Sequence, residues 1–240
     1  MSILAHSSGA YAQAARAARP EIARLADVQR RQDPLTVLHQ ERTAALAVAI
    51  GELVGLSAAQ LELVHLAATV HDIGKLAVPR DIVYKADCLS ESEYQVMQTH
   101  SARGSDMLRH LDCRLPLAEI ILQHHERLDG SGYPRGLAAG SIMKEAQILA
   151  VADVFDAIVS HRVYRPARPE DEALEELHAM AGRTLDEDAV HACTRHVLSR
   201  REDVSRLIWT NATASAPAHH VKSGRKPSGI PTDSRTVGGL

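Results

Sequence analysis

The sequence has few of the features that mark secreted or disulfide-rich proteins. Its three cysteines, Cys88, Cys113 and Cys193, are an odd number without a C-x-x-C spacing. They fit neither a disulfide framework nor a structural zinc site. We therefore expect reduced thiols in an intracellular protein.

Long apolar runs and a strong charge of one sign are also missing. No stretch of about 18 consecutive apolar residues occurs, so the sequence predicts no membrane-spanning helix. The start of the chain lacks the sustained apolar segment of a signal peptide. The net charge of -3 indicates neither a nucleic acid polymer nor a membrane surface as a partner. Together these absences predict a cytoplasmic protein.

No alternating strand pattern of useful length and no internal repeat is present, whereas apolar residues recur at helical spacing. Signals that start helices are clear. Asp33 and Pro34 form an N-cap and first helical position, Ser57 is a cap, and Ser90 with Glu93 forms a capping box. The sequence therefore predicts an all-α fold, a helical bundle of about seven or eight helices.

The chain divides by composition into three parts. Residues 1–32 are rich in Ala and Arg, which predicts an N-terminal helical extension interrupted at Pro20. Two roles are open for this extension: docking of a partner, and pairing in a homodimer. Residues 33–209 carry the helical pattern and the motifs described below. Residues 210–240 turn to Ser, Ala, Pro, Gly and Thr, which predicts a disordered tail.

The stretch His71-Asp72-Ile73-Gly74-Lys75 is the most informative in the chain. The imidazole of His71 suits one transition metal, and the carboxylate of Asp72 can bridge two. Lys75 is placed to reach an anion held at such metals. A single His-Asp pair can equally be a helix-end cap, and Lys75 can be a solvated helix-end side chain.

Further histidines and aspartates lie on or at the ends of different predicted helices, which is how helical bundles build metal sites. A single histidine on an apolar face is more often a core residue, so the hypothesis depends on the set, and spacing alone does not assign the ligands. Two metals bridged by a carboxylate suit hydrolysis of a phosphate ester. Imidazole and carboxylate together suit iron, manganese or zinc. The candidate ligands are His39, His71, Asp72, His100, His124, His125 and Asp153.

Three motifs together resemble the HD-GYP family, a subgroup of the HD-domain phosphohydrolases. They are H-D-I-G-K at 71–75, H-H-E-R-L-D-G-S-G-Y-P at 124–134 and V-A-D-V-F-D-A at 151–157, and the similarity covers about residues 33–208. The resemblance implies a cyclic di-GMP phosphodiesterase that forms pGpG, with GMP as a further product to be tested, by attack of a metal-bound hydroxide. It also implies two divalent metal ions as cofactors, iron or manganese in the first place.

The resemblance implies how the ligands are shared. One ion would be held by His39, His71, Asp72 and Asp153, and the other by Asp72, His100, His124 and His125. Asp72 and Lys75 would be catalytic, with Lys75 on the scissile phosphate. Arg162 and Arg165 match positions that hold substrate phosphates in this family, a task that suits the planar guanidinium. Solvation at the surface is the alternative for both arginines.

The loop Gly132-Tyr133-Pro134 lies near the active site in the family, so Gly132 and Tyr133 are candidate substrate contacts. The same loop has been implicated in contacts with GGDEF-domain proteins, and a plain structural turn is the alternative. Glu126, Asp129 and Asp156 either orient ligand histidines or cap helices.

The chain departs from the family pattern at three places. Some members have a glutamate one turn before the first histidine, which binds a third metal, and this chain has Leu35. Because leucine cannot ligate, we expect two metals. Leu128 replaces a frequent tryptophan and Asp87 a common glycine. Two other functions remain open: a cyclic di-GMP binding and signalling module with little turnover, and a phosphohydrolase of another cyclic dinucleotide.

Overall fold

The computed structural model describes residues 8–111, 115–161 and 166–214, and in these ranges all regular elements are helical. This confirms the predicted all-α fold. The described α-helices are α1 (Ser8–Gln32), α2 (Pro34–Val54), α3 (Ala58–Thr69), α4 (Arg80–Val83), α5 (Glu91–Arg109), α6 (Leu117–Gln123), α7 (Lys144–Val159), α8 (Glu170–Met180) and α9 (Glu187–Ala214). Two 3₁₀ helices, η1 (Ile73–Ala77) and η2 (Ala139–Ser141), complete the set.

The predicted helix starts are found where the sequence placed them. The side chain of Asp33 accepts a hydrogen bond from the N–H of Thr36 at 3.0 Å, which satisfies a free donor of the first turn of α2. Ser57 and Ser90 each open a helix with a complete capping box. α2 ends at Gly55, whose left-handed backbone closes the helix.

Three boundaries differ from the expectations. α1 continues through Pro20, which is exposed, because buried alanines and Ile22 pack the opposite face of the helix and compensate for one missing backbone hydrogen bond. α4 is a short helix within residues 76–89, a stretch whose sequence, with Pro79, predicts only a connecting segment. α9 extends to Ala214, beyond residue 209.

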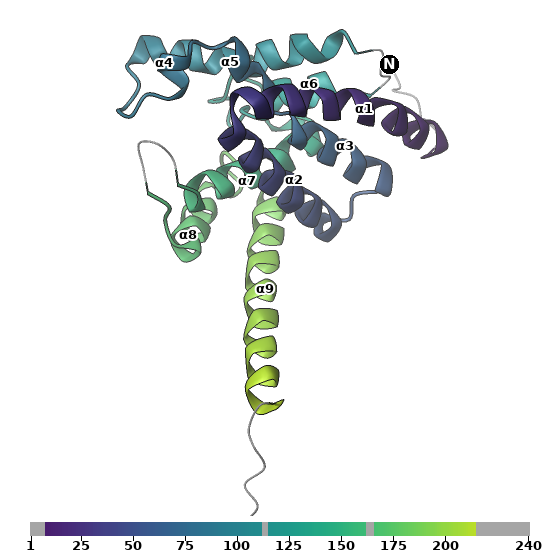
Figure 1. Ribbon diagram of the computed structural model, residues 1–240, viewed down its shortest axis with the longest axis vertical. Helices are drawn as coiled ribbons and strands as arrows, with labels where there is room; N and C mark the ends of the chain where they lie inside the picture. The colour runs from purple at the N-terminus through teal and green to yellow at the C-terminus, as the bar shows by residue number, and fades with distance from the viewer. Residues whose placement is uncertain (1–7, 112–114, 162–165, 215–240) are drawn as a thin grey trace, which may run out of the picture. The chain divides into compact units, whose positions relative to one another are not determined.

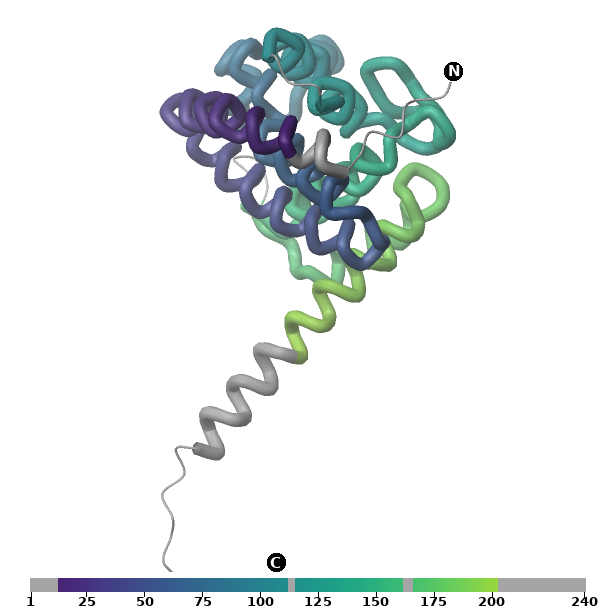
Figure 2. Tube along the Cα trace, turned by 90° about the vertical axis from the view of Figure 1, so that its right-hand side faces the viewer, coloured from purple at the N-terminus to yellow at the C-terminus, as the bar shows by residue number. Residues whose placement is uncertain are grey.

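The buried apolar side chains form two clusters. One joins α1, α3 and α6, and the other joins α2, α7, α8 and the first part of α9. α7 contributes to both, since Ala146 and Leu149 belong to the first and Val151 and Phe155 to the second. Figures 1 and 2 show α1, α2 and α3 as neighbouring helices, with α5 and α6 to one side of them.

The described residues up to Arg200 form one compact unit, and the second unit is described over residues 201–214. In the part of the chain that the structure describes, no helix combines the length and the apolarity needed to cross a bilayer.

Candidate active site

The seven predicted ligands meet inside the bundle. α2 carries His39, the turn between α3 and η1 carries His71 and Asp72, α5 carries His100, the end of α6 presents His124 and His125, and α7 carries Asp153. Each belongs to at least one of three overlapping groups, and within each group the ligand atoms lie within 4.8 Å of one another. Helices far apart in the sequence therefore place these side chains around one point.

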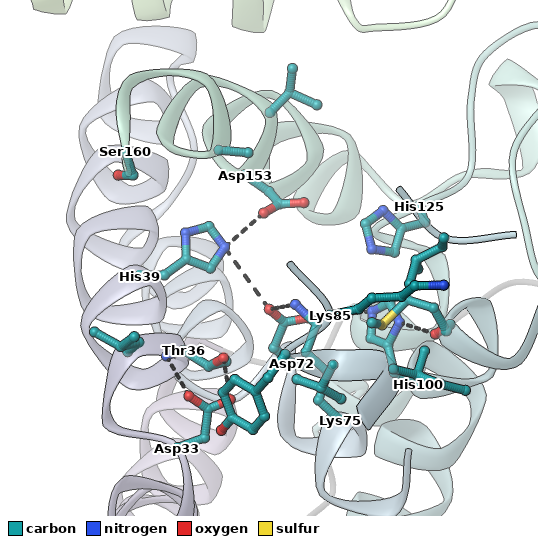
Figure 3. A pocket seen from close by; sticks show the side chains of 18 of the residues that line it. Asp33, Thr36, His39, Asp72, Lys75, Lys85, His100, His125, Asp153 and Ser160 are labelled. Atoms are coloured by element: carbon teal, nitrogen blue, oxygen red, sulfur yellow. Dashed lines mark hydrogen bonds and ion pairs between the residues drawn. The ribbon is translucent and has the colours of Figure 1, made fainter. Parts of the chain in front are cut away.

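Asp72 lies at the centre of this cluster and is only 2% exposed. Its Oδ1 lies 3.3 Å from Nε2 of His100. Its Oδ2 lies 3.6 Å from Nε2 of His71 and 3.9 Å from Nε2 of His39. Figure 3 shows His39 and His100 on opposite sides of this carboxylate. Each oxygen of Asp72 thus faces a different set of histidines, as a bridging ligand requires.

The orientation of three histidines is fixed by backbone carbonyls. Nδ1 of His71, His100 and His124 each contacts the carbonyl oxygen three residues earlier, at 2.8, 2.8 and 2.5 Å. A carbonyl oxygen only accepts, so Nδ1 carries the proton in each ring. In the neutral imidazole, Nε2 then presents its lone pair to the cluster.

These lone pairs show that the residues fit a metal. Nε2 of His71 is buried and has no hydrogen-bond partner among the residues that the structure describes. Nε2 of His100 lies 3.3 Å from Nε2 of His124. Burial lowers the pKa of His100, and burial together with neighbouring imidazoles lowers the pKa of His124 to about 3, so both rings are neutral at pH 7. A bound divalent cation would accept the facing lone pairs of His100 and His124 and the buried, unpaired Nε2 lone pair of His71.

His39 has a different environment. Its Nδ1 donates to Oδ2 of Asp156 at 2.6 Å, and its Nε2 donates to Oδ1 of Asp153 at 3.0 Å. Burial alone would lower the pKa of His39, but these two carboxylates raise it to about 9. Arg42 in turn binds both oxygens of Asp156, at 2.7 and 2.9 Å. Asp156 therefore orients His39, one of the two roles expected for it.

The protonation of His39 predicts how metal binding depends on pH. Its pKa of about 9 lies above the ordinary 6.5, so at pH 7 the ring holds a proton that a metal bound by His39 would have to displace. We expect the apparent affinity for Mn²⁺ to rise about tenfold per pH unit and to level off above about pH 9. Calorimetry in buffers of different ionisation enthalpy measures the released proton.

The variant Asp156→Asn provides the control for this pH dependence. Removing that carboxylate lowers the pKa of His39, so the plateau of Mn²⁺ affinity should move to lower pH. An affinity that stays constant from pH 6.5 to 9 in the wild-type protein would show that His39 does not exchange a proton for the metal.

The loop that follows α6 is held against the cluster by Glu126. This carboxylate is 2% exposed and accepts hydrogen bonds from the backbone N–H groups of Arg135 and Leu137, both at 2.8 Å. The ring of Tyr133 stacks on that of His125, with centroids 4.7 Å apart and planes 30° apart. Glu126 thus fixes the loop, and Tyr133 covers a predicted ligand.

Gly132 has a steric role in the same loop. A Cβ on it would lie 2.4–2.5 Å from backbone atoms of His125, Glu126 and Arg127. Gly132 does not line the cavity described next, whereas Tyr133 does. Asp129 accepts from the N–H of Ser131 at 3.0 Å, so it stabilises the turn.

A cavity of about 1030 Å³ opens over the cluster. Its cationic lining includes Lys75, whose Nζ lies 2.6 Å from Oδ2 of Asp72. Leu35 also lines it and is 64% exposed, so no side-chain ligand for a third metal occupies that position. Further cationic and aromatic lining residues, which the motifs did not point to as site residues, are Arg42, Tyr84, Lys85, Tyr94 and Arg127. Arg162 and Arg165 lie outside the described residues.

The fold and the cluster define an all-helical domain whose interior gathers histidines and aspartates in a geometry suited to divalent metals. The HD domain family model matches residues 24–189. The chain belongs to the HD domain family, which confirms the family predicted from the motifs.

Two relatives and one solved structure illustrate the match. The chain is 39% identical over 200 residues to the cyclic di-GMP phosphodiesterase response regulator RpfG of Xanthomonas campestris, covering 82% of this chain and 52% of RpfG. It is 34% identical to the 3'3'-cGAMP-specific phosphodiesterase 1 of Vibrio cholerae, covering 72% and 40%. The chain thus spans about half or less of the length of these relatives.

The solved structure is Bd1817, an HDG"Y"P protein from Bdellovibrio bacteriovorus. It superposes with a TM-score of 0.57 at 21% identity, covering 67% of this chain and 52% of that one. This likeness agrees with the helical fold described above.

Proposed function

We propose that this chain is a metal-dependent phosphodiesterase that linearises a cyclic dinucleotide, with cyclic di-GMP converted to pGpG as the leading reaction. The observation that carries the proposal is the position of Asp72 between two sets of imidazole Nε2 atoms. The name of the relative RpfG supports cyclic di-GMP as the substrate.

The ligand atoms suit two ions, iron or manganese in the first place. One would be held by His39, His71, Asp72 and Asp153, and the other by Asp72, His100, His124 and His125. Such ions, when bound, supply an activated water and neutralise phosphate charge. Asp72 would orient both halves of the site.

Lys75 is the residue proposed to contact the scissile phosphate. Its ammonium lies 2.6 Å from Asp72 and lines the cavity, so it can move from that carboxylate to a phosphate oxygen. There it would stabilise the charge that develops as the P–O bond breaks. Arg162 and Arg165 stay proposed contacts to the substrate's phosphates.

The cavity supports a dinucleotide rather than a small phosphate ester. Its volume of about 1030 Å³ lies at the upper end of ordinary ligand pockets. Tyr84, Tyr94 and Tyr133 lie in its lining beside Leu38 and Met97. Such surfaces suit flat bases on either side of a phosphodiester.

The test is metal content and turnover of one anaerobically purified sample. We expect about two metals per chain, product from cyclic di-GMP, and complete loss of activity with a chelator. A panel with 3'3'-cGAMP and pGpG decides the base preference and the extent of the second step. Activity that a chelator leaves unchanged would contradict the proposal.

Two other outcomes have definite meanings. Tight cyclic di-GMP binding by metal-loaded protein without product would favour the signalling module. Faster turnover of 3'3'-cGAMP would favour the second substrate, which the name of the Vibrio cholerae relative suggests.

Contacts of the loop at 132–134 with GGDEF-domain proteins stay a prediction, and so does a homodimer. Pairing through α1 would need its exposed residues, because Ala18, Ile22 and Ala26 pack inside the chain.

A further inference from the structure

Two buried glutamines close a ring of hydrogen bonds around the backbone of Asp72. The N–H of Asp72 donates to Oε1 of Gln40 at 2.9 Å. Nε2 of Gln40 donates to Oε1 of Gln29 at 3.0 Å, and Nε2 of Gln29 donates to the carbonyl oxygen of Asp72 at 3.2 Å. Both glutamines are 0% exposed. The ring therefore joins α1, α2 and the turn that carries the proposed bridging ligand.

The local backbone explains why Asp72 needs these partners. α3 ends at Thr69 and η1 begins at Ile73, so Asp72 lies in the turn between two helices. A buried N–H outside regular structure requires another acceptor, and here it is the side chain of Gln40. Because the ring binds both the N–H and the C=O of one residue, it fixes the position of its Cα.

α1 packs against α3 through buried apolar side chains and surface hydrogen bonds. Ile22 and Ala26, on the same helix as Gln29, are buried in the core cluster shared with α3. At the surface Arg19 makes two hydrogen bonds to Glu62 of α3, at 2.7 and 2.6 Å. The position of Gln29 is therefore set by the packing of the whole helix.

We infer that Gln29 and Gln40 are positioning residues for the metal-bridging carboxylate of Asp72, so that α1 is part of the metal centre. The inference rests on the proposed function, because it takes Asp72 as a metal ligand. Partners that orient a ligand from outside the metal's own shell typically change metal affinity 10–100-fold. A ligand held too loosely loses affinity even when every ligand atom is present.

The experiment measures Mn²⁺ binding to the full chain by calorimetry and by the EPR signal of bound Mn²⁺. Gln29→Met and Gln40→Met keep the side-chain length but remove the ring. We expect each to weaken Mn²⁺ binding about 10–100-fold and to broaden the EPR signal. The double variant should be little weaker than either single one, because each already opens the ring.

Ile22→Val is the matched control, because it loosens the same helix in its apolar core without touching the ring. We expect its Mn²⁺ affinity to stay at the wild-type value. Equal weakening by Ile22→Val would overturn the inference, because the effect would then come from the docking of α1 in general. Wild-type affinity in Gln29→Met would also overturn it and would leave the proposed function standing.

Hydrogen exchange of the metal-free protein gives a second measurement that does not depend on metal. The amide of Asp72 should exchange faster in both glutamine variants than in Ile22→Val, and equal rates would overturn the inference. A wild-type chain that binds no Mn²⁺ would refute the proposed function itself. The two failures are thus distinguishable.

Discussion

Replacing Asp72 by Asn is expected to remove most of the proposed phosphodiesterase activity while the fold stays intact. Asn has the same shape but carries no charge, so it cannot bridge two cations. Several kcal/mol of transition-state stabilisation depend on such metals, and about 4 kcal/mol corresponds to a loss of about 10³-fold in kcat/KM. We also expect fewer than two metals to remain bound after gel filtration, as measured by elemental analysis.

The electrostatics of the site explain why the charge matters more than the shape. Burial alone would raise the pKa of Asp72, but Lys75 and the surrounding histidines hold it well below its usual range. The carboxylate is therefore ionised at neutral pH. The substitution would leave Lys75 without its anionic partner, and the partly exposed ammonium can turn toward solvent.

Asp106→Asn is the control for this change. Asp106 makes a surface ion pair with Arg109 at 3.8 Å, and both side chains are more than half exposed. An exposed pair contributes little, so activity and metal content should not change. Unaltered circular dichroism in both variants separates loss of metal from loss of fold. Wild-type turnover by Asp72→Asn would refute the role of Asp72 as the bridging ligand.

The sequence predicted which histidines and aspartates would lie together because the signals that point to them are local. Capping residues such as Ser57 and Ser90 place the helices, and the motifs at 71–75 and 124–134 contain four of the seven ligands as adjacent pairs. The structure brings all seven into overlapping groups, which is what the resemblance implied.

The parts that could not be predicted depend on contacts between distant segments. Gln29 and Gln40 are ordinary polar residues in a helical pattern, and only the packed structure shows that they are buried. Arg42 and Asp156 are 114 positions apart, so their ion pair has no local signal. Buried polar networks form wherever backbone groups need partners, and that need appears only after the helices are packed.

Gly74 is another residue whose role depends on a contact with a distant segment. A glycine just after the helical pattern of residues 57–72 predicts that the helix ends there, because glycine is common at helix ends. That prediction is wrong: α3 already ends at Thr69, and Gly74 lies inside η1. Its true constraint is a close approach to α5. A Cβ at this position would lie 1.9 Å from the carbonyl oxygen of His100 and 2.5 Å from the backbone N of Gly104.

Gly74→Ala is therefore expected to be the most destabilising single methyl addition near the site. The atoms that it meets are backbone atoms, which cannot rotate away, so η1 must separate from α5. We expect the free energy of unfolding to fall by about 3 kcal/mol or more, and the melting temperature by about 6–12 °C. Thermal unfolding of the metal-free protein, followed by circular dichroism, measures this change.

The same displacement must also weaken metal binding. Asp72 lies two residues before Gly74, and the carbonyl that the new methyl group would strike belongs to His100. Pushing η1 from α5 lengthens the 3.3 Å separation between Asp72 and His100, so ligands on the two elements no longer face one point. Gly140→Ala is the matched control, because a Cβ there meets no atom of the described residues within 4 Å. A Gly74→Ala protein as stable and as rich in metal as Gly140→Ala would show that η1 and α5 do not pack at this distance.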